Sequence, residues 1–216
     1  MLKLTIVLPL IFVLIFAAVG CNQAEDDELL PVAVVNGVEV SREDFDREVA
    51  YYVDMYTNQG YQLTQEDMEL IKEMALEQVI NTQLLLQAAE QAGISAQSID
   101  AKGEFDYTRS LFDSEEEFDQ ALAEQGLTRE SFMELLTESL MIHELLSSQL
   151  DFDSIEVTDE EVQELFSLLE AEHGELDFEE VEPYLISQLQ EEKEDDLIDS
   201  YIQQLREEAS IEILGY

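Results

Sequence analysis

The chain contains few basic residues and a single cysteine. Nine lysines and arginines stand against 52 aspartates and glutamates, so its 216 residues carry a net charge of −43. A polyanion of this charge is repelled by phosphate backbones, which excludes nucleic acid as a partner. It is also repelled by anionic lipid headgroups, so contact with a membrane needs a covalent anchor. The lone Cys21 excludes a disulfide within the chain.

The sequence also lacks the motifs of common catalytic and metal sites. It has no His-x-x-x-His, no Gly-x-Ser-x-Gly and no glycine-rich phosphate loop. We interpret His143 as a packed or flanking side chain and His173 as the partner of a helix C-terminus. Asp151-Phe152-Asp153 begins like a calcium loop, but Ile155 and Glu156 stand where a third ligand and the turn glycine belong. We therefore expect no catalytic residue, no metal, no cofactor and no small-molecule substrate.

The acidity of the chain has two interpretations. Self-repulsion at this charge opposes a compact state unless salt screens it, and at 1 M salt the Debye length falls to about 3 Å. One interpretation is adaptation to a saline or alkaline medium, and the other is a general contribution to solubility. Because 46% of the residues are hydrophobic, the chain can bury a core. Its length suits one medium domain or two small lobes.

The long apolar run of the sequence lies at its amino terminus. Lys3 precedes residues 4–19, which are almost all apolar. That is short for a helix that crosses a bilayer, which needs about 20 residues, and typical of a signal peptide. The run ends Ala18-Val19-Gly20 before Cys21. This ending resembles a lipobox, with Ala18 in place of the usual leucine.

The lipobox pattern predicts a signal peptide at residues 1–20, cleaved before Cys21, and a lipid on the thiol of Cys21. The protein would then lie outside the cytoplasm, anchored on the outer face of the cytoplasmic membrane or in the periplasm. Residues 21–31 are acidic and lack apolar periodicity, which predicts a tether. The alternative is an ordinary signal peptide followed by an incidental free cysteine.

Short apolar segments near both ends of the remaining chain predict one small β-sheet. Val32–Val35 and Val38–Val40 flank Asn36-Gly37, a dipeptide that tolerates positive φ at both central turn positions. Ser210–Leu214 has the alternating pattern of a further strand. A lone hairpin is marginal in water. We therefore expect the last strand to join the hairpin in one sheet.

The segments between these strands carry helical periodicity and capping residues, so the predicted fold is mainly α. The last helix is predicted from about Glu179 to Ala209, with Pro183 in its first turn, where the missing N–H costs little. We predict two full capping boxes, Ser114 with Glu117 and Thr158 with Glu161. The predicted N-caps of the other helices are Ser41, Thr64, Ser98 and Thr128.

The last predicted helix has a polar middle. Residues 190–196 have no apolar side chain over about 10 Å of helix, and a helix that is polar all round often bridges two packed bodies. We predict that 32–216 form one domain, in which 32–60 plus 178–216 make a terminal lobe and 61–177 a central helical lobe. The alternative is a single core with one exposed helical turn.

Several segments, in this order, resemble the SurA/PrsA-type extracytoplasmic chaperones. The resemblance covers nearly the whole chain after the signal peptide and implies a helical SurA N-terminal-like chaperone domain with a small β-sheet joining the N-terminal hairpin and the C-terminal strand. The segments are Val32–Gly37 with Val38-x-Val40-Ser41, Leu84-Leu85-Leu86, Phe112–Phe118, Leu122-x-x-x-Gly126-Leu127-Thr128, Val157–Val162, Phe178–Val181 and Ala209–Ile213.

The chain departs from that family in one respect. Full members insert a parvulin-type prolyl isomerase domain between the segment at 157–161 and the last helix. Here the interval holds a predicted helix from Thr158 to about His173 and a short loop, too few residues for a separate folded domain. The resemblance therefore implies chaperone-type binding without the enzyme. Prolyl isomerisation is the alternative that an activity assay decides.

The resemblance implies a membrane-tethered holdase whose partners are unfolded or newly exported proteins. Methionine and aromatic side chains adapt to varied partners. The same residues at helical spacing serve equally well as core, so only exposed ones qualify. A competing function is an envelope adaptor or structural lipoprotein that binds one folded partner. The predicted client contacts are the exposed members of Tyr51, Tyr52, Met55, Tyr56, Met133 and Met141.

Overall fold

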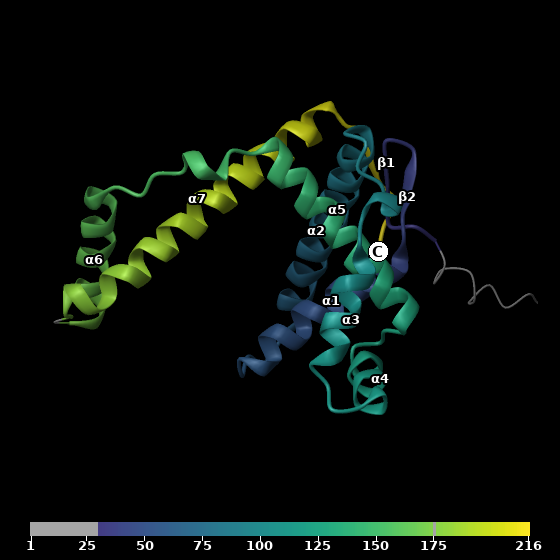
Figure 1. The fold of residues 1–216 in the computed structure, drawn as a ribbon, viewed down its shortest axis with the longest axis horizontal. Helices are drawn as coiled ribbons and strands as arrows, with labels where there is room; N and C mark the ends of the chain where they lie inside the picture. The colour runs from purple at the N-terminus through teal and green to yellow at the C-terminus, as the bar shows by residue number, and fades with distance from the viewer. Residues whose placement is uncertain (1–29, 175) are drawn as a thin grey trace, which may run out of the picture.

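The structure is a computed structural model that describes residues 30–174 and 176–216. The predicted signal peptide, Cys21 and most of the predicted tether lie outside these residues. Short 3₁₀ turns occur at Ala96–Ser98 and Phe152–Ser154. The elements in chain order are β1 (Ala33–Val35), β2 (Val38–Val40), α1 (Arg42–Asn58), α2 (Gln65–Gln91), α3 (Ala101–Ser110), α4 (Glu115–Glu124), α5 (Arg129–Gln149), α6 (Asp159–His173), α7 (Phe178–Glu208) and β3 (Ile211–Ile213). The predicted mainly helical fold is confirmed (Figure 1).

The small sheet joins the two ends of the described chain. Its strand order is β2-β1-β3, and both pairs are antiparallel. Asn36 and Gly37 form the hairpin turn with φ of 53° and 85°. The Asn36 side chain accepts a hydrogen bond from the Ser210 N–H at 2.9 Å and donates one to Gln87 Oε1 of α2 at 2.9 Å. The predicted pairing of the last strand with the hairpin is confirmed, and the turn itself fastens the sheet to α2.

Side-chain caps begin most helices where the sequence predicts them. Thr64, Thr128 and Thr158 each take part in a capping box, and Ser41 accepts a hydrogen bond from the Asp44 N–H. These local contacts satisfy backbone donors that a helix start leaves unpaired. The residue types at these positions therefore determine where the helices begin.

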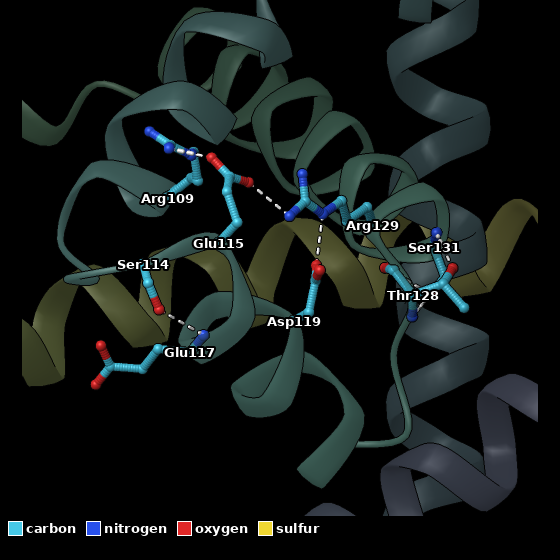
Figure 2. A network of polar contacts seen from close by, with 8 residues as sticks. All are labelled: Arg109, Ser114, Glu115, Glu117, Asp119, Thr128, Arg129 and Ser131. Carbon is cyan, nitrogen blue, oxygen red and sulfur yellow. Dashed lines mark hydrogen bonds and ion pairs between the residues drawn. The ribbon is translucent and has the colours of Figure 1, made fainter.

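The predicted capping box at Ser114 is only half formed. Ser114 Oγ accepts from the Glu117 N–H at 3.1 Å (Figure 2). The Glu117 carboxylate accepts instead from the Asp113 N–H, also at 3.1 Å. The Glu117 side chain reaches back one residue further than a capping box requires.

The predicted start of α3 is wrong, and so is the placement of Pro183 in the first turn of the last helix, although that helix begins within one residue of the predicted position. Helix α3 begins after Asp100, whose carboxylate accepts from the Gly103 N–H at 3.3 Å, whereas Ser98 ends a 3₁₀ turn. Helix α7 begins at Phe178 because Asp177 caps it. Pro183 is thus the sixth residue of α7 and falls in its second turn, where an ordinary residue would donate to the carbonyl four positions back.

We define the body as helices α1 to α5 together with the sheet. The body has two buried clusters, and helix α2 contributes residues to both. Its first part packs with the sheet and with Phe45 of α1, and its last part packs with Met141 and Leu145 of α5. A third cluster, of aromatic rings from α3, α4, α5 and the α3–α4 turn, surrounds the buried Phe118. The sequence-based lobes assign α2 to the central lobe, but α2 packs on the terminal sheet as well, so the lobe boundaries stay a prediction.

Helix α6 and the first part of α7, residues 178–189, form an arm that stands apart from the body (Figure 1). Val162 and Leu185 are buried in the arm, and the rings of Phe166 and Phe178 lie 5.0 Å apart. The far part of α7 returns to the body, where Leu205 packs on both buried clusters. The polar segment 190–196 lies between these two packed regions.

Lys193 ties the polar middle of α7 to the segment that leads into α6. Its Nζ lies 2.7 Å from Glu161 Oε1 and donates to the Glu156 carbonyl at 2.6 Å. The Thr158 N–H and hydroxyl also donate to the Glu161 carboxylate, at 2.8 and 2.9 Å. Lys193 first, and Thr158 second, lower the pKa of Glu161 to about 2.

The Lys193→Gln variant should therefore raise the pKa of Glu161 toward its ordinary value. A lowered pKa contributes stability that is present above the unfolded value of 4.5 and is lost as the pH falls through about 2. We expect the variant to lose the part of this contribution that comes from Lys193 and to keep the part that comes from Thr158. Carboxyl-carbon NMR titration measures the pKa directly. Lys72→Gln, which removes the partner of Glu69 on α2, is the matched control, and an unchanged Glu161 pKa in Lys193→Gln would contradict the assignment.

Candidate functional site

An open groove crosses the body over one face of α2. Its floor is a stripe of α2 residues spaced three or four positions apart, which places them on one helical face. Strand β2 and α1 form one wall and α5 forms the other. Two adjoining hollows, of about 510 and 180 Å³, share Gln83, Leu86 and Glu138. The floor residues are Val79, Thr82, Gln83, Leu86, Gln87 and Glu90. We call this surface the α2–α5 groove.

Apolar side chains from three elements lie in the larger hollow. Val38 of β2 is 46% exposed, and Leu86 of α2 and Met133 of α5 are half-buried. Met141, which is also on α5, lines the same hollow but is itself buried. These side chains give the groove an apolar surface that stays open to solvent. Such a surface can take up another apolar side chain without the body unfolding.

The groove lining also contains acidic side chains, next to neutral polar ones. Helix α1 contributes Asp44 and Glu48, and α5 contributes Glu134 and Glu138. Arg47 is the basic side chain among the lining residues, and it forms an ion pair with Asp44. Within the described chain, the carboxylates of Glu48, Glu134 and Glu138 accept no hydrogen bond and form no ion pair. The groove therefore presents unpaired negative charge beside its apolar floor.

Two of these carboxylates are half-buried, and burial changes their ionisation. Burial raises the pKa of Glu138, and neighbouring Asp44 and Glu134 raise it further against the opposing effect of Arg47. Burial likewise raises the pKa of Glu48, with Arg47 opposing. Both shifts mean that the charged form is poorly solvated in the groove. A cation brought next to these groups would stabilise their charged form.

The structure separates the predicted client contacts into two groups. Met133 and Met141 come together in the α2–α5 groove. The four α1 residues lie elsewhere. Tyr51 is 61% exposed, Tyr52 packs on the first buried cluster, and their rings are 5.6 Å apart. Met55 is half-buried on the same helix.

Tyr56 lines a separate hollow at the α1–α2 hairpin, outside the α2–α5 groove. Its ring lies edge-on to Tyr61 with centroids 5.9 Å apart. The hollow measures about 200 Å³, and its other lining residues are Gln62, Leu63, Asp67, Leu70, Ile71 and Met74. The role of all six predicted residues in binding stays a prediction, and only Met133 and Met141 lie in the larger groove.

Sequence analysis missed the contribution of Val38 and Leu86 to the groove. Sequence analysis assigns Val38 only to the sheet, and it names Leu86 only in the segment Leu84-Leu85-Leu86 of the family resemblance. The usable signal is the mixed character of the α2 face, where Thr82, Gln83 and Gln87 interrupt the apolar residues. A helix face that is half polar is unsuited to a closed core and suits an open surface.

A network of ion pairs holds α3, α4 and the start of α5 together (Figure 2). Arg129 lies 2.6 Å from Glu115 and also pairs with Asp119, while Arg109 pairs with the other oxygen of Glu115. These partners lower the pKa of both carboxyls. The Arg129 guanidinium also lies 5.6 Å from the Phe118 ring centroid. The network fixes the first turn of α5, which leads into the groove wall.

Other kinds of site have little support among residues 30–174 and 176–216. No helix there is both long and apolar enough to cross a bilayer. No three histidine, cysteine, aspartate or glutamate side chains in that part of the chain are grouped so that they could hold a metal ion. His143 is exposed on α5, and α6 ends at His173.

Comparison with known proteins identifies the family. The family model described as SurA-like N-terminal domain matches residues 1–146, a range that includes the hairpin and ends within α5. The foldase protein PrsA from each of two strains of Clostridium kluyveri is 25% identical over 189 residues. The match covers 78% of this chain and 55% of the relative, so the chain spans about half the length of the curated relatives it matches. No parvulin domain is found with the family match. The resemblance seen in the sequence is confirmed, and the chain belongs to the family of SurA-like N-terminal domains.

Proposed function

We propose that this protein is a holdase-type chaperone that binds unfolded or newly exported polypeptides outside the cytoplasm. Its family and the foldase name of its relatives support a chaperone-type role. The observation that carries the proposal is the α2–α5 groove, an open and partly apolar surface whose lining includes Met133 and Met141. The predicted lipid on Cys21 would keep the protein at the membrane that its clients cross.

The groove suits weak and reversible binding of many sequences. Burial of one large apolar side chain contributes about 1.5–3 kcal/mol, and ordering an extended client segment offsets much of the gain from two or three such side chains. Methionine side chains adapt to differently shaped partners because they are unbranched and polarisable. A client would thus be held against aggregation and released without an energy source.

The proposed role is binding without catalysis. Helix α6 and a short loop occupy the interval in which full members of the family insert the isomerase domain. A proline-peptide isomerisation assay showing catalysis above background would contradict this part of the proposal.

An aggregation assay tests the holdase function. A chemically denatured client enzyme is diluted into buffer with increasing amounts of the protein, and light scattering is followed. We expect suppression at stoichiometric excess, because each groove covers one exposed apolar segment at a time. A folded protein of similar net charge is the control for charge alone. Absence of suppression at large excess, at low and high salt, would count against the proposal.

An envelope adaptor with one folded partner is the second candidate, and the arm favours it. Leu168 of α6 and Tyr184 of α7 are 64% and 65% exposed, and Ile186 is 40% exposed. Exposed apolar residues on a projecting element suit contact with a partner. Capture of a single folded protein that fails to bind after Leu168→Asp would support the adaptor, whereas binding to unrelated unfolded chains supports the chaperone.

A further inference from the structure

We propose that the α2–α5 groove selects client segments in which apolar residues are flanked by lysine or arginine. The inference rests on the proposed chaperone function and specifies the chemical class of its clients. It comes from the presence of both carboxylates and apolar side chains in each hollow of the groove.

Both hollows of the groove combine the two kinds of side chain. The larger hollow has Val38 and Met133 together with Glu90 and Glu134. The smaller hollow has Val40, Val79 and Leu135 together with Asp44 and Glu48. Glu138 and Leu86 line both. A segment lying along the groove therefore meets apolar surface and negative charge in each hollow.

The cations of the described chain are already engaged by groups of the chain itself. Arg42 donates to the carbonyls of Leu30 and Gly215, and the other seven described lysines and arginines each pair with a carboxylate. Within the described residues, no lysine or arginine is left over to pair with the groove carboxylates, so a cationic side chain of a client can do so. The expected client is therefore one whose positive charges complement the groove carboxylates.

The groove carboxylates differ from the many exposed ones of the chain. An exposed carboxylate is solvated and screened, so it adds little to binding. Glu48 and Glu138 are half-buried beside apolar side chains, where solvation is poorer and charge interactions are stronger. A client lysine or arginine would supply the hydrogen-bond donors that these groups lack within the described chain. A client glutamate would be repelled.

Fluorescence anisotropy with labelled peptides tests the inference on the full chain. The peptides share one apolar core and carry lysine, glutamine or glutamate at both flanks. We expect the lysine-flanked peptide to bind about tenfold more tightly than the glutamine-flanked one and the glutamate-flanked peptide to bind most weakly. In the Glu48→Gln/Glu138→Gln variant the lysine advantage, taken as the ratio of the affinities for the lysine- and glutamine-flanked peptides, should fall to about twofold.

The matched control is Glu191→Gln/Glu192→Gln, which removes the same charge from the exposed polar middle of α7. It should keep the lysine advantage. Circular dichroism melting checks that both variants are folded. Equal binding of the lysine- and glutamine-flanked peptides, or equal loss in both double variants, overturns the inference but leaves the chaperone function standing.

Two other outcomes also decide the matter. If no peptide binds and no client aggregation is suppressed, the proposed function fails together with the inference. If light scattering shows a dimer that excludes all peptides, the groove is filled by a second copy of the chain, and the inference is overturned.

Discussion

The Glu212→Pro variant should lose about 1–3 kcal/mol of unfolding free energy, because β3 pairs with β1 in the sheet that joins the two ends of the described chain. The Asn36 N–H donates to the Ser210 carbonyl at 2.8 Å, and the Leu214 N–H donates to the Val32 carbonyl at 2.9 Å. This alternation places the N–H of Glu212 toward β1. Proline would remove that donor at the centre of the ladder. Urea unfolding followed by circular dichroism measures the loss.

The neighbouring Ile213→Pro variant is the matched control. The N–H of Ile213 faces the open edge of the sheet, where proline is tolerated, and its side chain is 56% exposed. We expect a loss of less than about 1 kcal/mol for this variant. Equal losses for the two variants would show that the ladder between β1 and β3 contributes little.

The Met133→Asp variant should lose most of the client binding. Met133 is half-buried in the larger hollow, and aspartate there would replace apolar surface with a further unpaired charge. The protein concentration needed for half-maximal suppression of aggregation should rise about tenfold. The fold should persist, since Met133 belongs to none of the fully buried positions. Light scattering with a denatured client measures the effect, and thermal melting verifies the fold.

Leu168→Asp in the arm is the control for this change. It introduces the same charge at an apolar residue that is 64% exposed, outside the groove. Suppression should stay at the level of the unchanged protein. If Leu168→Asp lost suppression of aggregation while Met133→Asp kept it, the result would indicate that clients bind to the arm.

Sequence analysis predicts those parts of the fold that local rules determine. The Asn36-Gly37 turn and the caps at Thr64, Thr128 and Thr158 depend on contacts within four residues, so their residue types suffice. The pairing of β3 with β1 is a long-range contact, but it could be predicted because a lone hairpin would be marginal.

The wrong predictions concern helix starts at which two local hydrogen-bonding arrangements are possible. Ser98 and Asp100 are both good N-caps, and only the structure shows that the aspartate begins α3. The Glu117 carboxylate has two backbone N–H groups within reach and takes that of Asp113. These choices depend on small differences in backbone geometry that residue types do not determine.

The α2–α5 groove could not be predicted because it has no sequence motif. It forms from β2, α1, α2, the 3₁₀ turn after α2, and α5, which span positions 38 to 141, and none of these segments has more than an ordinary amphipathic pattern by itself. Sequence analysis predicts Tyr51, Tyr56 and Met133 as client contacts for the same reason, their adaptable aromatic or methionine side chains. Helix packing, however, places the two tyrosines on another part of the body. Only tertiary packing distinguishes these positions.

Methyl NMR of the methionines tests the location of the client site most directly. Met133 and Met141 line the groove, Met74 lines the hollow beside Tyr56, and Met68 lies on the first part of α2. On addition of an unfolded client segment with lysine flanks, the methyl signals of Met133 and Met141 should shift or broaden while those of Met68 and Met74 stay unchanged. A response confined to Met74, or to none of the four, would contradict binding in the α2–α5 groove.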